Sequence, residues 1–442
     1  MTYSYNSVAQ EVVCAEDAIS SLPGILDRLG STRAMVVCGP SILEQSNVVQ
    51  RVLDALGDRC VGLFSGVAPH SPVHTLDEAM RLAKDSKPDA LVSVGGGSNH
   101  DTAKGIATLL GEGGKIHDHQ VIFEPPDKMI YPILSSCRVP IVAVSTTMGA
   151  AELSRGAGFA DKDLGRKVSV ADPGAIPRSI VIDGQALATT PMSILLSTAI
   201  GQLRVAIESV YSVKHNPICD SLSLYAISML VKNLPECSKL ETDCLLNTKT
   251  AAALVSLGSV DGGINTATAH YVGGIFDVPH GEANAIMLPH NMRFNAEASA
   301  DRQAMIAQAM GVDTARMSDY EAALAAADAV EELRDSLGLP NRLRDVGVPE
   351  EGLVLIAAAT LKDRSLATNP TPNQSCLCCA VPGRAAIGLG EELADQLQER
   401  VGLFHLGSVP AIGDYLEPGA LDSLFIGFSG ADWDDAVILA PD

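Results

Sequence analysis

The stretch "LVSVGGGSNHDTAKGIATLL" (residues 91–110) carries the strongest local structural signal in this 442-residue chain. A β-rich run ends in three glycines and a serine at positions 95–98, and a helical pattern containing Asp101 and Lys104 follows at once. Glycines let a backbone come close to a ligand, and the helix N-terminus offers free N–H groups and a positive dipole end, which suit a pyrophosphate. A tight turn is the simpler alternative, because the stretch matches neither the G-x-G-x-x-G fingerprint nor a Walker loop.

Strands and helices alternate on both sides of this stretch, from about Val12 to Ile141. The expected strands are "AMVVCGPS" (34–41), "CVGLFSG" (60–66), "ALVSVGGGS" (90–98) and "VPIVAVSTT" (139–147). The expected helices are "PGILDRLG" (23–30), "SILEQSNVVQRVLDALGD" (41–58) and "HTLDEAMRLAKDSKPD" (74–89). Such alternation predicts right-handed βαβ units, a parallel sheet and therefore an α/β fold.

The chain changes character at about Pro191, where long amphipathic segments rich in alanine and leucine begin. Examples are "CDSLSLYAISMLVKNLP" (219–235), "DRQAMIAQAMG" (301–311) and "SDYEAALAAADAVEELRDSLG" (318–338). Their periodicity predicts helices. We therefore expect an α/β domain over residues 1–190, an all-helical domain over 191–372 and an acidic C-terminal extension over 373–442. In that extension Cys376, Cys378 and Cys379 have no partner ligands at a metal-binding spacing, and we interpret them as unpaired thiols.

Composition narrows the class of partner. The formal net charge is −22, from 31 basic and 53 acidic residues, which argues against nucleic acid or an anionic membrane as a partner and favours a small molecule. The apolar runs are shorter than the ~20 residues of a membrane span, and the N-terminus lacks the pattern of a signal peptide. Ten irregularly spaced cysteines suggest a reducing compartment, so we expect a cytoplasmic protein.

A second loop of interest follows the predicted strand that ends at "VAVSTTMG". Thr146 and Thr147 supply hydroxyl groups at the carboxyl end of a parallel strand, which is the usual edge of a ligand crevice in such sheets. Serine and threonine also commonly cap helices, so this loop alone is a weak signal. The glycine loop and the threonine loop strengthen each other as a predicted nucleotide site.

Several stretches together resemble the iron-containing alcohol dehydrogenase superfamily. They are "SGVAPHSPV" (65–73), "GGGSNHDTAKG" (95–105), "STTMGAAELSRGAGFADKDLGRKVSVADPGAIPRSIVID" (145–183), "TPMSILLSTAIGQLRVAIE" (190–208) and "HYVGGIFDVPHGEANAIMLPHNMRFN" (270–295). The similarity covers roughly residues 10–372 and looks closest to the maleylacetate reductase-like branch. It implies a Rossmann-like NAD(P)-binding domain, an all-helical domain and a cleft between them for cofactor and substrate. We also expect a homodimer.

The resemblance implies a set of cofactor-binding residues. Positions that match the diphosphate loop, the second nucleotide loop and a lysine near the nicotinamide ribose are Gly95, Gly96, Gly97, Ser98, Asp101, Thr146, Thr147 and Lys167. Gly39 falls near the position where NAD-preferring relatives carry an acid. A glycine there would leave room for a 2′-phosphate, which slightly favours NADPH.

The resemblance also bears on metal binding. Relatives that bind iron or zinc use an Asp and a His four residues apart on one helix, followed by two further histidines, and the i, i+4 spacing directs both side chains to one ion. The matching positions here are Gly201, Val205, Thr266 and His280. One imidazole cannot hold Fe²⁺ or Zn²⁺ against water, because open sites need about three protein ligands. We therefore expect no metal.

Two histidines and an arginine are the predicted catalytic residues. His270 matches a histidine near the nicotinamide, and an imidazole can deliver a proton to a carbonyl oxygen as hydride arrives. His280 could orient the substrate or act as that acid instead, whereas we interpret His290 as structural, at the far end of a helix that ends at Pro289. Arg204, beside Val205, would suit a carboxylate or enolate if it faces the cleft, and is a solvated helix residue if it faces outwards.

Three functions remain open from the sequence. The first is a metal-independent NAD(P)H-dependent oxidoreductase that reduces a ketone, a keto acid or an activated double bond, in the manner of maleylacetate reductase. The second is a fold of this family recruited for a non-redox lyase, cyclase or isomerase step, since a fold does not fix a function. A silent scaffold that uses the acidic tail is the third and weakest alternative.

Overall fold

The computed structural model describes residues 3, 5, 10–124, 128–161, 166–260, 262–350, 352–361 and 363–371. They form two compact units. The first unit contains residues up to 202 together with residues 232–257, and the second contains residues 203–231 and those from 258 onward. The predicted extension and its three cysteines lie outside the described residues.

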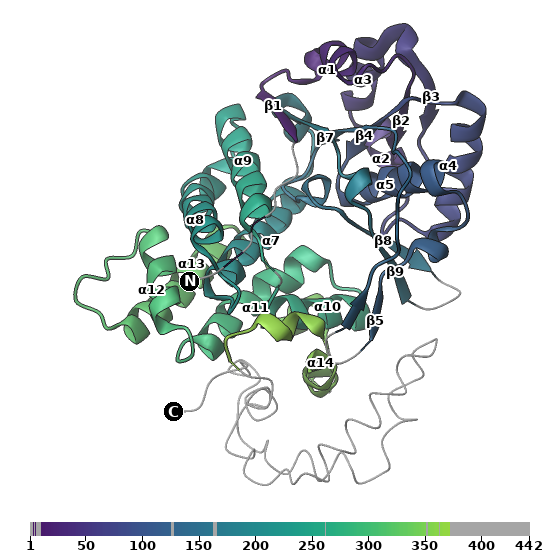
Figure 1. The fold of residues 1–442 in the computed structure, drawn as a ribbon. Helices are drawn as coiled ribbons and strands as arrows, with labels where there is room; N and C mark the ends of the chain where they lie inside the picture. The colour runs from purple at the N-terminus through teal and green to yellow at the C-terminus, as the bar shows by residue number, and fades with distance from the viewer. Residues whose placement is uncertain are drawn as a thin grey trace. The chain divides into compact units, whose positions relative to one another are not determined.

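A six-stranded parallel sheet forms the centre of the first unit (Figure 1). Its strands are β1 (Glu11–Ala15), β2 (Ala34–Cys38), β3 (Cys60–Phe64), β4 (Ala90–Gly95), β7 (Ile141–Ser145) and β10 (Ser179–Asp183). They lie in the order β1-β10-β7-β4-β2-β3. Strands β2, β4, β7 and β10 are buried along their whole length, as expected for a parallel sheet that is covered on both faces. The four strands predicted from the sequence are confirmed.

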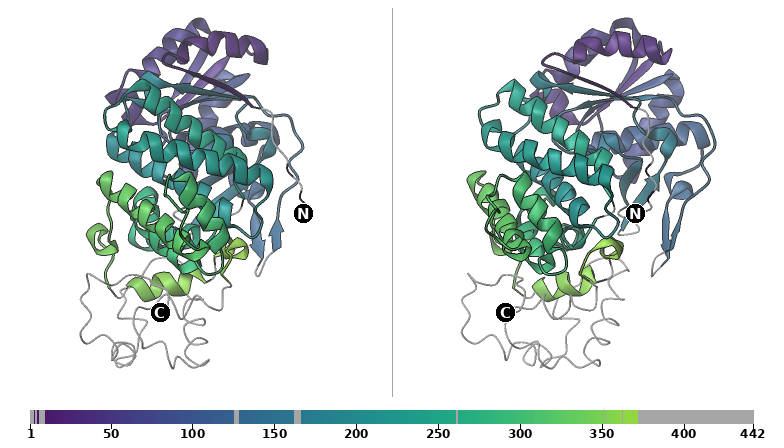
Figure 2. Two further views of the ribbon diagram at one scale, coloured as in Figure 1. Left: turned by 90° about the vertical axis from the view of Figure 1, so that its left-hand side faces the viewer. Right: turned by 60° about the vertical axis from the view of Figure 1, so that its left-hand side comes forward.

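Helices cover both faces of this sheet (Figures 1 and 2). They are α1 (Leu22–Leu29), α2 (Pro40–Gln45), α3 (Val48–Leu56), α4 (Val73–Ser86) and α5 (Gly97–Glu112). Alternate residues of β2 enter two separate cores, with Met35 packed among residues of α4 and α5 and Val36 among residues of α1 and α3. The chain therefore leaves β2 on one face and β4 on the other. Between these neighbouring strands lies a topological switch point, where doubly wound sheets bind ligands.

Two short antiparallel hairpins complete the first unit. One pairs β5 (Ile122–Glu124) with β6 (Lys128–Ile130), and the other pairs β8 (Gly156–Asp161) with β9 (Arg166–Ala171). The second hairpin packs against α5. It therefore lies close to the helix that follows the glycine loop.

Helices form the second unit, as predicted (Figure 1). Those of the C-terminal half are α10 (Ile264–Phe276), α11 (His280–Asn295), α12 (Ala300–Ala309), α13 (Asp319–Ser336) and α14 (Gly352–Thr360). Helix α10 packs on α11, and α13 packs on both α11 and α12. Ser318 begins α13 with a capping box, in which its hydroxyl accepts the amide of Glu321.

Three further helices connect the two units along the chain, namely α7 (Met192–Tyr211), α8 (Pro217–Cys237) and α9 (Thr242–Gly258). Helix α7 is the one described helix that is long and apolar enough to cross a membrane by length and composition. More than half of its most apolar window, 56%, is nevertheless buried within the protein. A helix that buries this much of its apolar surface against other protein segments is typical of a protein core.

Three expectations about elements need correction. The helix predicted over residues 41–58 is two helices, because Ser46 adopts extended backbone and ends α2 before α3 begins. Residues 232–257 group with the first unit, whereas the sequence-based division placed the whole of residues 191–372 in the helical domain. Helix α11 does not end at Pro289 but continues to Asn295, so the missing amide of this proline is accommodated inside the helix.

Candidate functional site

The glycine loop joins the carboxyl end of β4 to the N-terminus of α5. Gly95 has φ of +138°, and a Cβ built there would lie 2.1 Å from Asn99 Nδ2, so only glycine fits. Gly96 is the N-cap residue of α5, and no side chain caps this helix end. The loop therefore presents the open N-terminus of a 16-residue helix at the switch point, which suits the diphosphate of a nucleotide cofactor.

The threonine loop lies directly against the glycine loop. The Thr146 amide donates to the carbonyl of Gly95, and a Cβ at Gly96 would lie 3.0 Å from Thr147 Cγ2. Thr146 is buried, and its carbonyl accepts the Thr190 hydroxyl at 2.6 Å. The two loops adjoin because β4 pairs with β7, so the carboxyl ends of the two strands lie side by side.

A third segment, around residues 65–73, contacts the same loop. His70 donates its backbone amide to Ser98 Oγ at 3.1 Å, and the Ser71 hydroxyl donates to the Ser98 carbonyl at 2.9 Å. Both residues have positive φ values, 62° and 48°, which non-glycine residues adopt at a cost of about 1–3 kcal/mol. This strained turn holds Ser98, and strain of this kind is concentrated at ligand-binding sites.

Three further residues that the resemblance places near the cofactor differ in their surroundings. Asp101 Oδ2 accepts the amide of Gly158 in β8 at 3.1 Å, and burial raises the pKa of this carboxyl. Lys167 is exposed on β9, opposite Ala160. Gly39 follows β2, and a Cβ there would lie 3.0 Å from the carbonyl oxygen of Val67. Their roles towards a cofactor stay predictions.

A buried charged pair supports the threonine loop. Glu152 and Lys249 are 1% and 0% exposed, and their side chains meet at 2.5 Å. Lys249 also donates to the carbonyl of Gly149, within the same loop. Burial alone would raise the pKa of Glu152, but the charge of Lys249 outweighs it and the net pKa is lowered. Helix α9 thus anchors the loop that carries Thr147.

His100 lies on the other side of this carboxylate. Its Nδ1 shares a hydrogen bond of 2.8 Å with the Ser93 hydroxyl, and its Nε2 is 3.8 Å from Glu152 Oε2 without a hydrogen-bond partner among the described residues. Burial lowers the pKa of His100 to about 4, so the ring is neutral at pH 7. Lys249 is therefore the cation that balances Glu152.

In the second unit, α10 and α11 bring His270 and His280 together. Their rings stack with centroids 5.9 Å apart and an interplanar angle of 19°. Helix α10 ends at Phe276, Asp277 takes the left-handed conformation, and His280 begins α11, so a sharp reversal returns the chain towards His270. The two predicted catalytic histidines are therefore neighbours in the second unit.

Asp363, which sequence reasoning missed, completes this group. His270 Nδ1 lies 2.9 Å from Asp363 Oδ2. Burial raises the pKa of Asp363, but the hydrogen bond and charge of His270, with the amide of Ser365, outweigh it and lower the net pKa. The carboxylate can only accept, so Nδ1 carries the proton and the other ring nitrogen, Nε2, faces away from this carboxylate.

His290 does not belong to this pair. Since α11 is continuous, ten residues separate it from His280 by about 15 Å along the axis. Burial, with the charge of Arg293, lowers the pKa of His290 to about 4. Its Nδ1 has no hydrogen-bond partner among the described residues, so the ring is not fully hydrogen-bonded, and its structural role stays a prediction.

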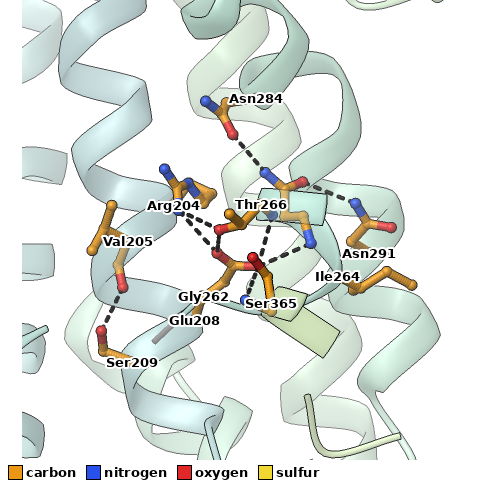
Figure 3. A network of polar contacts seen from close by, with 12 residues as sticks. Arg204, Val205, Glu208, Ser209, Gly262, Ile264, Thr266, Asn284, Asn291 and Ser365 are labelled. Atoms are coloured by element: carbon orange, nitrogen blue, oxygen red, sulfur yellow. Dashed lines mark hydrogen bonds and ion pairs between the residues drawn. The ribbon is translucent and has the colours of Figure 1, made fainter. Parts of the chain in front are cut away.

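Arg204 lies inside a polar network (Figure 3). Its Nη1 donates to Thr266 Oγ1 at 2.5 Å and to Glu208 Oε2 at 3.1 Å. Glu208 is 1% exposed, and its other oxygen accepts three backbone amides at the start of α10, those of Gly263, Asn265 and Thr266. The side chain of Arg204 is only 12% exposed, which rules out the solvated alternative left open by the sequence.

The donor set around these residues does not fit iron or zinc. The implied ligand positions hold Gly201 and Val205, and the Thr266 hydroxyl is bound to Glu208 and Arg204. Within the part of the chain that the structure describes, no group of three His, Cys, Asp or Glu side chains could hold a metal ion. The guanidinium of Arg204, which is positively charged, contacts Thr266 at one of these ligand positions.

Comparison with known proteins identifies the class. The model of the iron-containing alcohol dehydrogenases matches residues 9–184, and that of the C-terminal domain of the Fe-containing alcohol dehydrogenase family matches residues 195–376. The chain belongs to this family and is an oxidoreductase homologue, as the resemblance predicted.

Individual relatives are similar over most of their length. The lactaldehyde reductase of Escherichia coli (strain K12) is 30% identical over 80% of this chain and 92% of its own. The NAD-dependent methanol dehydrogenase of Bacillus methanolicus is 27% identical over 81% of this chain and 93% of its own. The maleylacetate reductase of Burkholderia cepacia is 28% identical over 82% of this chain and 90% of its own. An alcohol dehydrogenase structure from Oenococcus oeni superposes with a TM-score of 0.78 at 25% identity, covering 90% of this chain and 100% of its own. Maleylacetate reductase is thus one relative among several of similar identity.

Proposed function

We propose that this protein is an NAD(P)H-dependent reductase that acts without a metal ion on a ketone, a keto acid or an activated double bond. Family membership supports an oxidoreductase, and the relative from Bacillus methanolicus is named as NAD-dependent. The open N-terminus of α5, with a glycine loop that excludes any Cβ at Gly95, fits a dinucleotide. The cofactor supplies the hydride when bound.

The observation that carries the proposal is the contact of His270 with Asp363. Because Asp363 holds the Nδ1 proton, His270 carries an Nε2 proton only as the imidazolium. Transfer of that proton to the substrate oxygen leaves the neutral Nδ1–H tautomer, which the carboxylate continues to hold. Asp363 therefore fixes the ring orientation and stabilises the cationic form before transfer.

His280 has a supporting part in this proposal. Its ring lies near that of His270, with centroids 5.9 Å apart and planes 19° from parallel, so it can contact the same substrate and orient it. Metal independence rests on the residues at the implied ligand positions, where Gly201 and Val205 offer no donor atoms. The net charge of −22 supports a small-molecule substrate. The cytoplasmic location and the homodimer stay predictions.

The test is a turnover assay with NADPH and NADH against a panel of small ketones, keto acids and enones, after dialysis against a chelator. We expect His270→Ala to lower kcat by roughly 10²–10⁴-fold, as for loss of a general acid, and Asp363→Asn to lower it less and shift the pH profile. The matched control is His215→Ala, since His215 pairs with Asp220 in the same manner at 3.1 Å. Nicotinamide that binds but is never oxidised by any carbonyl would instead favour the non-redox alternative.

A further inference from the structure

The Arg204 guanidinium has an unused face. Its polar contacts with Glu208 and Thr266 all involve Nη1, and Nε is buried with no hydrogen-bond partner among the described residues. In Figure 3 the remaining nitrogens point away from Glu208. A buried donor without a partner is unfavourable, and native proteins rarely leave one unless a ligand or water meets it.

The Glu208 carboxylate is hydrogen-bonded without the Nε and Nη2 atoms of Arg204. Its Oε1 accepts three backbone amides of α10, at 2.9–3.1 Å, and its Oε2 also accepts the Thr266 hydroxyl at 2.5 Å. The carboxylate thus caps a helix N-terminus, where the helix dipole already favours a negative charge. One nitrogen of Arg204 completes this cap. The Nε–Nη2 edge remains, and this edge has the geometry that binds a carboxylate through two parallel hydrogen bonds.

The position of this edge relates it to the proposed proton donor. Arg204 is bonded to Thr266, and Thr266 lies four residues before His270 on α10, so both project from one face of the helix. One turn of helix, about 5.4 Å, separates the two positions along the axis. A small molecule could therefore place a carboxylate on Arg204 and a carbonyl oxygen near His270.

We infer that Arg204 is the binding residue for a substrate carboxylate, and that the substrate class is a small oxo acid or an enone that carries a carboxylate. This inference rests on the proposed function for its reaction, but not for the binding of the anion. Thr266 and Glu208 act as positioning residues, because they hold Nη1 and leave the Nε–Nη2 edge of the guanidinium without a partner among the described residues. The purely structural alternative is that Arg204 only bridges α7 to the start of α10.

Binding of an unreactive probe separates these alternatives. Malonate carries carboxylates on a short chain, and malonamide is its neutral counterpart. Isothermal titration of the full-length protein, with and without NADPH, should show malonate binding and at least tenfold weaker binding of malonamide. Arg204→Lys should weaken malonate binding at least tenfold, because lysine cannot form the bidentate contact, and Arg204→Leu should abolish it. Arg293→Lys is the matched control, since the Arg293 side chain is 17% exposed and pairs with two acids, Asp328 and Glu331.

Three outcomes overturn the inference. They are no malonate binding by the wild-type protein, equal binding by Arg204→Lys, and an equal loss in Arg293→Lys. A folded Arg204→Lys variant that is destabilised yet binds malonate normally would establish the bridging role alone. If malonate binds through Arg204 but no carbonyl compound is reduced, the inference stands and the proposed function fails. If reduction occurs, the ratio of kcat/KM for pyruvate to that for methyl pyruvate should fall at least tenfold in Arg204→Lys.

Discussion

The buried pair of Lys249 and Glu152 offers a quantitative test of how the cofactor loops are held. Lys249→Met keeps the length of the side chain but removes the cation, and it leaves Glu152 almost fully buried with neutral His100 at 3.8 Å. Breaking one side of a buried ion pair typically destabilises a protein by about 3–5 kcal/mol. The double variant Lys249→Met/Glu152→Gln removes both charges of the pair, so we expect it to recover most of this loss.

The free energies of unfolding of the wild type and of Lys249→Met should depend differently on pH. In the wild-type protein the pKa of Glu152 is lowered, so its contribution to stability is present above the unfolded value of 4.5 and is lost only at lower pH. Lys249→Met removes the largest effect that offsets burial, so we expect the folded pKa of Glu152 to rise above its unfolded value. The variant then gains stability as the pH falls from 7 towards 5, while the wild type does not. The stability difference should therefore shrink over this range.

Urea unfolding followed by far-UV circular dichroism measures the free energies, and hydrogen–deuterium exchange localises the loss to residues 146–153 and α9. Lys239→Met is the control, since Lys239 and Glu236 form an exposed lysine–glutamate pair, and we expect no measurable change there. NADPH affinity should fall in Lys249→Met because Gly149 loses its anchor. A variant as stable as wild type at pH 7, or a difference that does not change with pH, would refute the reasoning.

Three further predictions concern the loops, His290 and metal. Gly96→Val should raise the Kd for NADPH at least tenfold, because even its Cβ would lie 3.0 Å from Thr147, whereas Gly97→Ala meets only ordinary contact at 3.6 Å and should change the Kd less. His290→Gln should lose less stability than the wild type as the pH falls from 7 to 4.5, and its turnover should be unchanged. The reason is that the pKa of His290 is about 4 in the folded wild type against 6.5 when unfolded, so protonation favours the unfolded chain. Over the whole range between these two pKa values the difference amounts to roughly 3 kcal/mol. Elemental analysis should find less than one iron or zinc per chain, with activity unaffected by chelation; one tightly held ion whose removal abolishes turnover would contradict this.

The parallel sheet could be predicted from sequence because its signals are local. Buried parallel strands are short apolar runs bounded by glycine, and "ALVSVGGGS" shows both features at β4. The glycine loop could be placed for the same reason. The break between α2 and α3 was missed because Ser46 and Asn47 are compatible with a helix, and the extended backbone at Ser46 is stabilised by its hydroxyl, which accepts the Val48 amide at 3.3 Å.

The contacts that define the candidate sites were less predictable because they join distant segments. His270 and Asp363 are 93 residues apart, and Lys249 and Glu152 are 97 apart. No periodicity or spacing connects such pairs. A local signal existed only for Glu208, which lies four residues after Arg204 on α7 and thus on the same helical face. Even there, the sequence could not show that the carboxylate caps α10.

The charge at Arg204 limits the chemistry that this site can support. A bound Zn²⁺ or Fe²⁺ would bring two positive charges and could stabilise a developing alkoxide as a Lewis acid. Arg204 brings one positive charge, and the carboxylate of Glu208 balances it, so the net charge of the pair is close to zero before a ligand binds. Such a site can orient a carboxylate through hydrogen bonds but can polarise an unactivated carbonyl only weakly. We therefore expect reduction of oxo acids and conjugated enones, whose electrophilic carbon needs little further activation, and at least 100-fold slower oxidation of simple primary alcohols. Comparable rates on ethanol and on an oxo acid, in metal-free protein, would show that some other group supplies the missing positive charge.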